Sequence, residues 1–106
     1  MVVAYHRPTK AIIDTTAITE NIKNEIAHLP SETFLFAVVK ANGYGHGAVQ
    51  TAQAAKEGGA AGFCVATIDE AIELREAGIT DPLLILGAVN VQDIPLLAEY
   101  DFSFPV

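Results

Sequence analysis

The stretch FAVVKANGYGHG, residues 36–47, decides how the whole chain is interpreted. An apolar run typical of a buried strand ends directly in Lys40, and a glycine-rich loop follows. In parallel α/β proteins, ligands gather at the carboxyl ends of the strands. Lys40 is therefore either a surface charge that ends a strand or an amine held out for chemistry. A partly dry site would favour its neutral, nucleophilic form, which can form a Schiff base with a carbonyl substrate or an aldehyde cofactor.

The amino-acid composition favours a small folded domain and argues against nucleic-acid-binding and membrane-spanning proteins. The chain has 106 residues, of which 51% are hydrophobic and 18% charged, as expected for one small folded domain. A net charge of −7 with only six Lys and Arg argues against nucleic-acid binding. The single cysteine, Cys64, cannot form an internal disulfide and fits a reducing compartment. We find no signal peptide and no apolar run near the ~18 residues of a membrane span, so we expect a cytoplasmic protein.

Apolar runs and helical patterns alternate along the chain, which predicts an α/β fold with a parallel sheet. Strands are expected at 10–15, 33–39, 62–66, 83–88 and 102–106, and helices at 16–29, 47–57, 69–77 and 90–99. Strands that are apolar on both faces suit a parallel sheet that is covered by helices or closed into a barrel. Thr67 and Glu70 have the spacing of a capping box at the start of the third helix.

The length of the chain bears on its domain organisation. A (β/α)8 barrel needs ~250 residues, and this chain supplies about half of them. The pattern also stops at 102–106, within or just after an expected strand. We therefore expect the N-terminal part of a larger protein rather than a small open α/β domain.

The residues resemble a known family. AVVKANGYGHG (37–47) resembles the cofactor-lysine signature of the alanine racemases, pyridoxal 5'-phosphate enzymes with a TIM-barrel domain of fold type III. The segments 11–22 and 67–88 are also similar to that family. The resemblance implies that 1–106 is the N-terminal portion of the cofactor-binding barrel domain, without the C-terminal half-barrel and the β domain. Many members have Ala in place of Gly43, a difference that we expect only to loosen the loop.

The resemblance implies interconversion of L- and D-alanine, which supplies D-alanine for cell-wall peptidoglycan, by a cytoplasmic homodimer. Lys40 matches the catalytic lysine that binds pyridoxal phosphate, and Tyr44 matches a tyrosine that contacts the cofactor phosphate. Val38 and Leu86 match apolar residues that line the cofactor. The second acid/base in the family is a tyrosine of the partner subunit's β domain, and nothing here matches it. We expect the 106-residue chain alone to be inactive.

Other residues have structural interpretations. We expect Cys64 to be a small buried hydrophobe and His46 to make a structural hydrogen bond. Four acidic residues should form a solvated helix face across which Arg75 could pair; they are Asp69, Glu70, Glu73 and Glu76. No metal site is indicated. Two alternatives stay open: a racemase for another amino acid such as serine, and a non-catalytic pyridoxal-phosphate-binding or structural α/β module.

Overall fold

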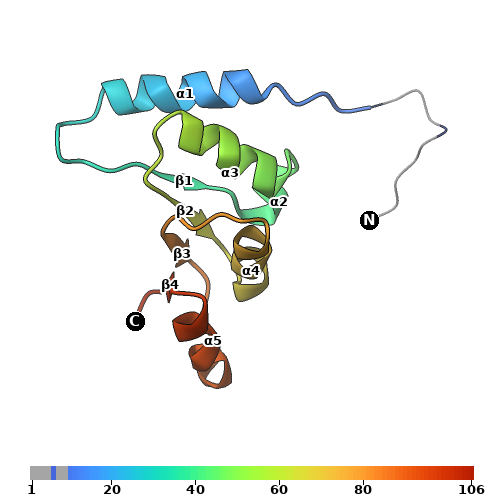
Figure 1. The fold of residues 1–106 in the computed structure, drawn as a ribbon, viewed down its shortest axis with the longest axis vertical. Helices are drawn as coiled ribbons and strands as arrows, with labels where there is room; N and C mark the ends of the chain where they lie inside the picture. The colour runs from blue at the N-terminus through green and yellow to red at the C-terminus, as the bar shows by residue number, and fades with distance from the viewer. Residues whose placement is uncertain (1–5, 7–9) are drawn as a thin grey trace.

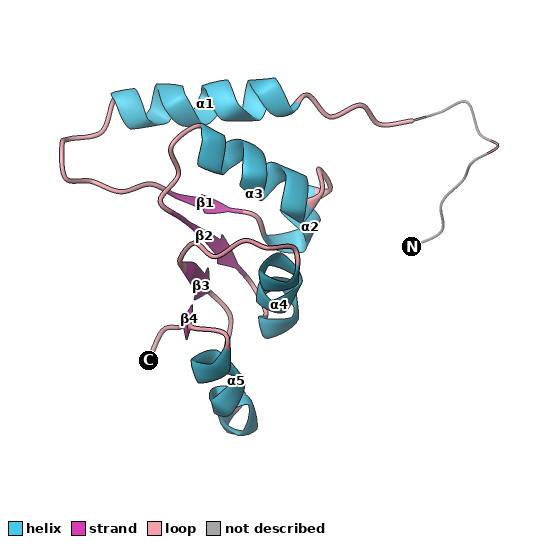
Figure 2. Cartoon of the chain, viewed as in Figure 1, coloured by secondary structure: helices cyan, strands magenta, loops and turns pink. Residues whose placement is uncertain are grey.

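The computed structural model describes residue 6 and residues 10–106. Helices and strands alternate along these residues (Figures 1 and 2). In chain order the elements are α1 (Thr15–Ala27), β1 (Phe36–Val38), α2 (Lys40–Tyr44), α3 (Ala48–Glu57), β2 (Gly62–Val65), α4 (Ile68–Glu76), β3 (Leu83–Ile85), the 3₁₀ helix η1 (Val91–Asp93), α5 (Ile94–Glu99) and β4 (Phe102–Ser103). The alternation agrees with the prediction from the sequence, with strands shorter than expected.

The four strands form one parallel sheet in the order β1-β2-β3-β4. The register places Val38 opposite Cys64, Cys64 opposite Leu84, and Leu84 opposite Ser103. Each strand therefore lies beside the next one in the sequence. A doubly wound sheet instead reverses its strand order at a switch point. This sequential order is the one found in barrels.

The hydrophobic core lies on one face of the sheet. Side chains alternate between faces along a strand, so Val39 is 1% exposed while its neighbour Val38 is 40% exposed. The core face packs against small and aliphatic side chains of α3, α4 and α5, including Ala52, Leu74 and Leu97. On the opposite face, the apolar side chains of Phe36 and Val38 in β1 remain exposed. Helices thus cover one face, as around a barrel, rather than both.

Helix α1 packs along the outer side of α3 (Figure 1). The contact is close because Gly58 ends α3: a Cβ there would lie 2.7 Å from Cβ of Ile22 and 2.7 Å from the carbonyl oxygen of Thr19. The hydroxyl of Thr19 donates a hydrogen bond to the carbonyl of Ala54 at 2.8 Å. These contacts attach α1 to the layer of helices.

The prediction of a strand at 10–15 is wrong. Residues 10–14 form no helix or strand, and α1 begins at Thr15. The side chain of Asp14 accepts a hydrogen bond from the N–H of Ala17 at 3.2 Å and so caps the helix. Ile12 is 81% exposed, and no described strand pairs with this segment. Without a neighbouring strand its backbone groups have no ladder to join.

Arg75 has a different role from the predicted ion pair with helix carboxylates. Its guanidinium donates to the backbone carbonyls of Tyr100 (2.9 Å), Ile79 (3.0 Å), Asp81 (2.6 Å) and Asp101 (3.1 Å). The planar guanidinium carries five donors in a fixed fork, so it can bind several carbonyls at once. Arg75 therefore ties the end of α4 to the turn before β4.

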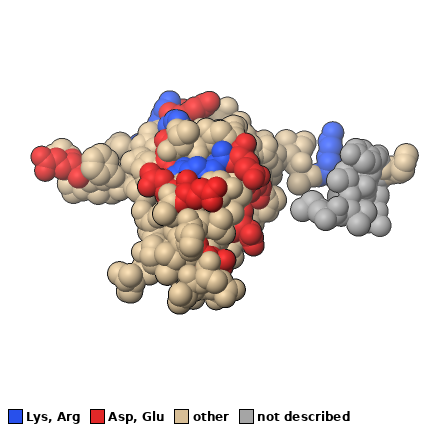
Figure 3. Space-filling view, turned by 60° about the horizontal axis from the view of Figure 1, so that its bottom comes forward, with Lys and Arg blue, Asp and Glu red and all other residues tan. Residues whose placement is uncertain are grey.

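The surface carries mostly acidic charge. In the view of Figure 3, Asp and Glu side chains surround a small group of Lys and Arg across the middle of the molecule. Two ion pairs are found among the described residues, Lys23 with Glu20 and Lys56 with Asp81. Within the same residues, no helix combines the length and the apolar character that crossing a membrane requires.

Candidate active site

Lys40 lies at the carboxyl edge of the sheet, as predicted. It follows β1 by one residue, begins α2 and is half-buried. The N–H of Val39 donates to the carbonyl of Cys64 at 2.9 Å, which extends the pairing of β1 with β2 up to the lysine. Val39 points into the core. Val38, the last residue of β1, points to the other face and is exposed.

The turn that follows Lys40 is left-handed. The φ angles of Ala41, Asn42, Gly43 and Tyr44 are 52°, 55°, 63° and 55°. For an L-residue this conformation costs roughly 1–2 kcal/mol. Gly43 avoids that cost, and its N–H donates to the carbonyl of Val39 at 2.9 Å. Glycine at 43 therefore relieves strain rather than only loosening the loop.

Hydrogen bonds fix the far end of the turn. The side-chain oxygen of Asn42 accepts from the N–H of Ala48 at 3.0 Å, and its carbonyl accepts from the N–H of Gly47 at 2.8 Å. The Nδ1 of His46 lies 3.1 Å from the carbonyl oxygen of Gly43, to which an Nδ1–H group donates. The expected structural hydrogen bond of His46 is confirmed.

Glu70 fixes the near end of the turn. Its Oε2 accepts from the N–H of Ala41 at 2.6 Å, and its Oε1 accepts from the N–H groups of Ala66 (2.7 Å) and Thr67 (3.0 Å). The N–H of Glu70 donates to the Thr67 hydroxyl at 3.2 Å, so the predicted capping box is confirmed.

The prediction of a solvated acidic face on α4 holds for three of its four residues. Asp69, Glu73 and Glu76 are exposed. For Glu70 the prediction is wrong, because its carboxylate turns back to three backbone N–H groups. The spacing from Thr67 to Glu70 predicted only the capping box at the start of α4. Nothing near either residue in the sequence indicated the bond to Ala41.

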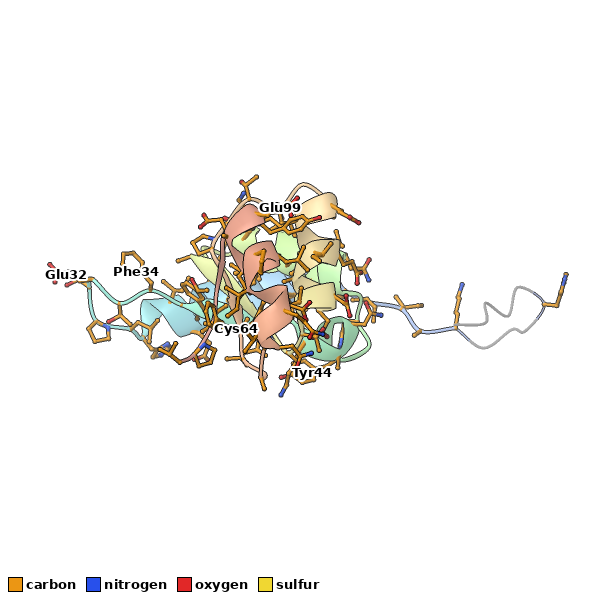
Figure 4. All side chains as sticks on the ribbon, turned by 90° about the horizontal axis from the view of Figure 1, so that it is seen from below. Glu32, Phe34, Tyr44, Cys64 and Glu99 are labelled. Atoms are coloured by element: carbon orange, nitrogen blue, oxygen red, sulfur yellow. The ribbon has the colours of Figure 1, made fainter. Side chains whose placement is uncertain are left out.

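The other predicted site residues lie at the same edge of the sheet. Tyr44 ends the left-handed turn and is 59% exposed. In Figure 4 it lies on the opposite side of the molecule from Glu99 of α5. Val38 (40% exposed) ends β1, and Leu86 (44% exposed) directly follows β3. An amine, a phenol and two apolar side chains thus come from the ends of two strands and one turn.

Cys64 is a buried strand residue, as predicted. It is 7% exposed, and burial raises the pKa of its thiol. A thiol held neutral is a poor nucleophile. Among residue 6 and residues 10–106, no group of three or more His, Cys, Asp and Glu is placed to hold a metal ion.

A surface hollow of about 330 Å³ lies beside the turn but apart from the lysine. It extends from Asn42 along the start of α3 to Glu73 of α4. Neither Lys40 nor Tyr44 lines it. We therefore place the candidate site at the sheet edge around Lys40 and not in this hollow.

Comparisons with known proteins show to which family the chain belongs. A family model described as "Alanine racemase, N-terminal domain" matches residues 13–106. The alanine racemase of Levilactobacillus brevis is 57% identical over 106 residues, which are 100% of this chain and 28% of that protein. The crystal structure of alanine racemase from E. faecalis superposes with a TM-score of 0.97 at 65% identity and covers 100% of this chain and 29% of that one.

A racemase of another specificity is also similar. The histidine racemase from Leuconostoc mesenteroides subsp. sake superposes with a TM-score of 0.69 at 30% identity, over 83% of this chain and 23% of that one. The chain spans less than a third of the length of the curated relatives that it matches. The superpositions confirm the expected fold, the N-terminal part of a TIM barrel. The chain belongs to the family of alanine racemase N-terminal domains.

Proposed function

We propose that residues 1–106 are the N-terminal portion of the cofactor-binding barrel of a pyridoxal-5'-phosphate-dependent alanine racemase. The observation that carries the proposal is the position of Lys40: half-buried, one residue beyond the carboxyl end of β1, and at the start of a turn held at both ends. Curated relatives at 54–57% identity are alanine racemases, which supports this reaction over others.

The residues present fit the cofactor. Pyridoxal phosphate needs an amine for its aldehyde, an apolar surface for its ring and hydrogen-bond donors for its phosphate. Lys40 offers the amine, and Val38 and Leu86 expose apolar side chains on the uncovered face at the same edge. Tyr44 offers a phenol that is 59% exposed and can donate to a phosphate oxygen. When bound, the cofactor would act as an electron sink that acidifies the Cα proton of the amino acid.

Lys40 would act as an acid and base on one face of the amino acid. Its neutral Nζ can take the Cα proton, and its ammonium form can return a proton to the same face. Inversion needs a second acid/base on the opposite face, because one group cannot reach both. The resemblance assigns that role to a tyrosine of a partner subunit. A homodimer is therefore part of the proposal.

The substrate belongs to the proposal as well. The similarity to a histidine racemase supports an alternative in which the same barrel portion serves another amino acid. Alanine remains the favoured substrate because the relatives at 54–57% identity carry that name. A role in supplying D-alanine for peptidoglycan and a cytoplasmic location follow from the same proposal.

The test measures interconversion of L- and D-alanine by the full-length protein that carries this chain, with pyridoxal phosphate added. Lys40→Ala should lose the activity together with the visible absorption of the bound cofactor. Lys23→Ala is the matched control, because Lys23 lies on α1 with its side chain 55% exposed. It should keep both. A wild-type protein that interconverts no amino acid, or a Lys40→Ala variant that keeps racemising, would overturn the proposal.

A further inference from the structure

We propose that Glu70 is a positioning residue for Lys40, acting through the backbone. This inference rests on the proposed function for its catalytic meaning. The structural part rests on three hydrogen bonds of one carboxylate. Two of them, donated by the N–H groups of Ala66 and Thr67, hold Oε1 at the junction of β2 and α4. In the third, the N–H of Ala41 donates to Oε2.

The turn after Lys40 needs such a contact. The four successive residues from Ala41 to Tyr44 hold positive φ angles, and only Gly43 among them is a glycine. Strained conformations of this kind persist only where the surrounding structure fixes them. The N–H of Ala41 opens the turn, and its partner is the Glu70 carboxylate, 29 residues away in the sequence. A charged acceptor makes this hydrogen bond stronger than a neutral one.

Glu70 is itself held firmly. It lies in the first turn of α4. The following residues Ala71 and Leu74 are fully buried in the core. The position of Oε2 is therefore set by the packing of α4 on the sheet. Through this contact, the β1–α2 junction that carries the lysine is fixed relative to the β2–α4 junction.

The contact reaches the lysine through the backbone and not through an ion pair. Neither of the two ion pairs among the described residues contains Glu70 or Lys40. The bonded N–H belongs to the peptide group that links Lys40 to Ala41. Loss of the contact would free that peptide group and let the amine move from its productive position. Small misplacements of a reacting group can cost about a hundredfold in rate.

Glu70→Gln is the informative variant. The amide oxygen can still accept from Ala66 and Thr67, but the NH₂ group cannot accept from Ala41. Thr67→Ala is the matched control, because it removes the other half of the capping box and leaves both Glu70 oxygens in place. Glu73→Gln removes the same charge from an exposed position on α4.

The first measurement is amide hydrogen exchange in the cofactor-free, full-length protein. In Glu70→Gln the Ala41 amide should exchange faster by roughly ten- to a hundredfold, as expected for one hydrogen bond to a charged group. In Thr67→Ala the amide of Glu70 should exchange faster and that of Ala41 should not. Unchanged exchange at Ala41 in Glu70→Gln, or equal acceleration there in Thr67→Ala, would overturn the proposal.

The second measurement separates positioning from stability. In the loaded enzyme, Glu70→Gln should lower kcat about tenfold or more with little change in KM, while Thr67→Ala and Glu73→Gln keep the wild-type kcat. Equal losses of kcat in Glu70→Gln and Thr67→Ala would contradict positioning. A wild-type protein without racemase activity would refute the proposed function alone, because the exchange experiment needs neither cofactor nor substrate.

Discussion

The side-chain oxygen of Asn42 accepts a hydrogen bond from the N–H of Ala48 at 3.0 Å and joins the left-handed turn to the first residue of α3. The N-cap residue of this helix, Gly47, has no side chain with which to cap it. Asn42 therefore does from a distance what an N-cap side chain does locally. Together with Glu70 at the near end, it fixes the turn on two helices.

Substitution of Asn42 should show two separable effects. Asn42→Ala removes the cap and places alanine at a φ of 55°, so it should cost about 1–2 kcal/mol of folding free energy. Asn42→Gly also removes the cap but accepts the positive φ, so it should recover about 1 kcal/mol of that loss. Urea unfolding of both variants measures the difference. Equal destabilisation would show that the backbone at 42 is not strained.

The two glycines of the turn offer a similar comparison. Gly43 and Gly45 both have positive φ, 63° and 90°. A Cβ at Gly43 would lie 3.0 Å from the hydroxyl oxygen of Thr51, whereas a Cβ at Gly45 would meet nothing within 4 Å. Each Gly→Ala change should destabilise by about 1 kcal/mol from backbone strain. The change at Gly43 should cost more because of the added contact. A smaller loss at Gly43 than at Gly45 in urea unfolding would contradict this.

The order of the elements could be predicted because its signals are local. Apolar runs at 36–38, 62–65 and 83–85 are separated by helical patterns and by glycine or proline. The segment 10–15 has the composition of a strand, but composition does not reveal whether a partner strand lies beside it. Asp14, as a helix cap, gave the competing local signal. The outcome depends on pairing with distant residues, which a single sequence does not show.

Only the part of the candidate site that has local signals in the sequence could be predicted. Lys40 could be placed because the strand that precedes it is evident in the sequence. The left-handed turn could not be predicted, because Ala41 and Tyr44 ordinarily avoid positive φ. Two contacts hold the turn, that of Glu70 with Ala41 and that of Asn42 with Ala48. Both depend on the folded arrangement of the chain, which the sequence pattern does not reveal. Arg75 was misassigned because its partners are backbone carbonyls, which carry no sequence signature.

The buried thiol should make stability depend on pH in the alkaline range. Burial raises the pKa of Cys64 above its ordinary value of 9.0. Below pH 9 both folded and unfolded chains hold the thiol proton, so its contribution is constant. As the pH rises above 9, the unfolded chain ionises first, and stability falls until the folded thiol also ionises. Urea unfolding of wild type and Cys64→Ala from pH 7 to 11 should show this extra loss in wild type alone. Parallel pH profiles would refute it.

Tyr44 should affect the cofactor more than the fold. Tyr44→Phe keeps the exposed ring and removes only the hydroxyl, which we propose donates to the cofactor phosphate. One hydrogen bond to a charged group is worth roughly 1.5–3 kcal/mol. The Kd for pyridoxal phosphate should rise by about ten- to a hundredfold, with an unchanged urea midpoint. An unchanged Kd would show that the phenol does not contact the phosphate.

Lys40 is the residue that we propose binds the cofactor. The most direct test is borohydride reduction of the full-length protein with pyridoxal phosphate, followed by mass-spectrometric mapping of the labelled peptide. Because Lys40 is held half-buried at the carboxyl edge of the sheet, we expect one label per chain, on Lys40. A label on Lys10, Lys23 or Lys56 instead, with Lys40 unmodified, would contradict it.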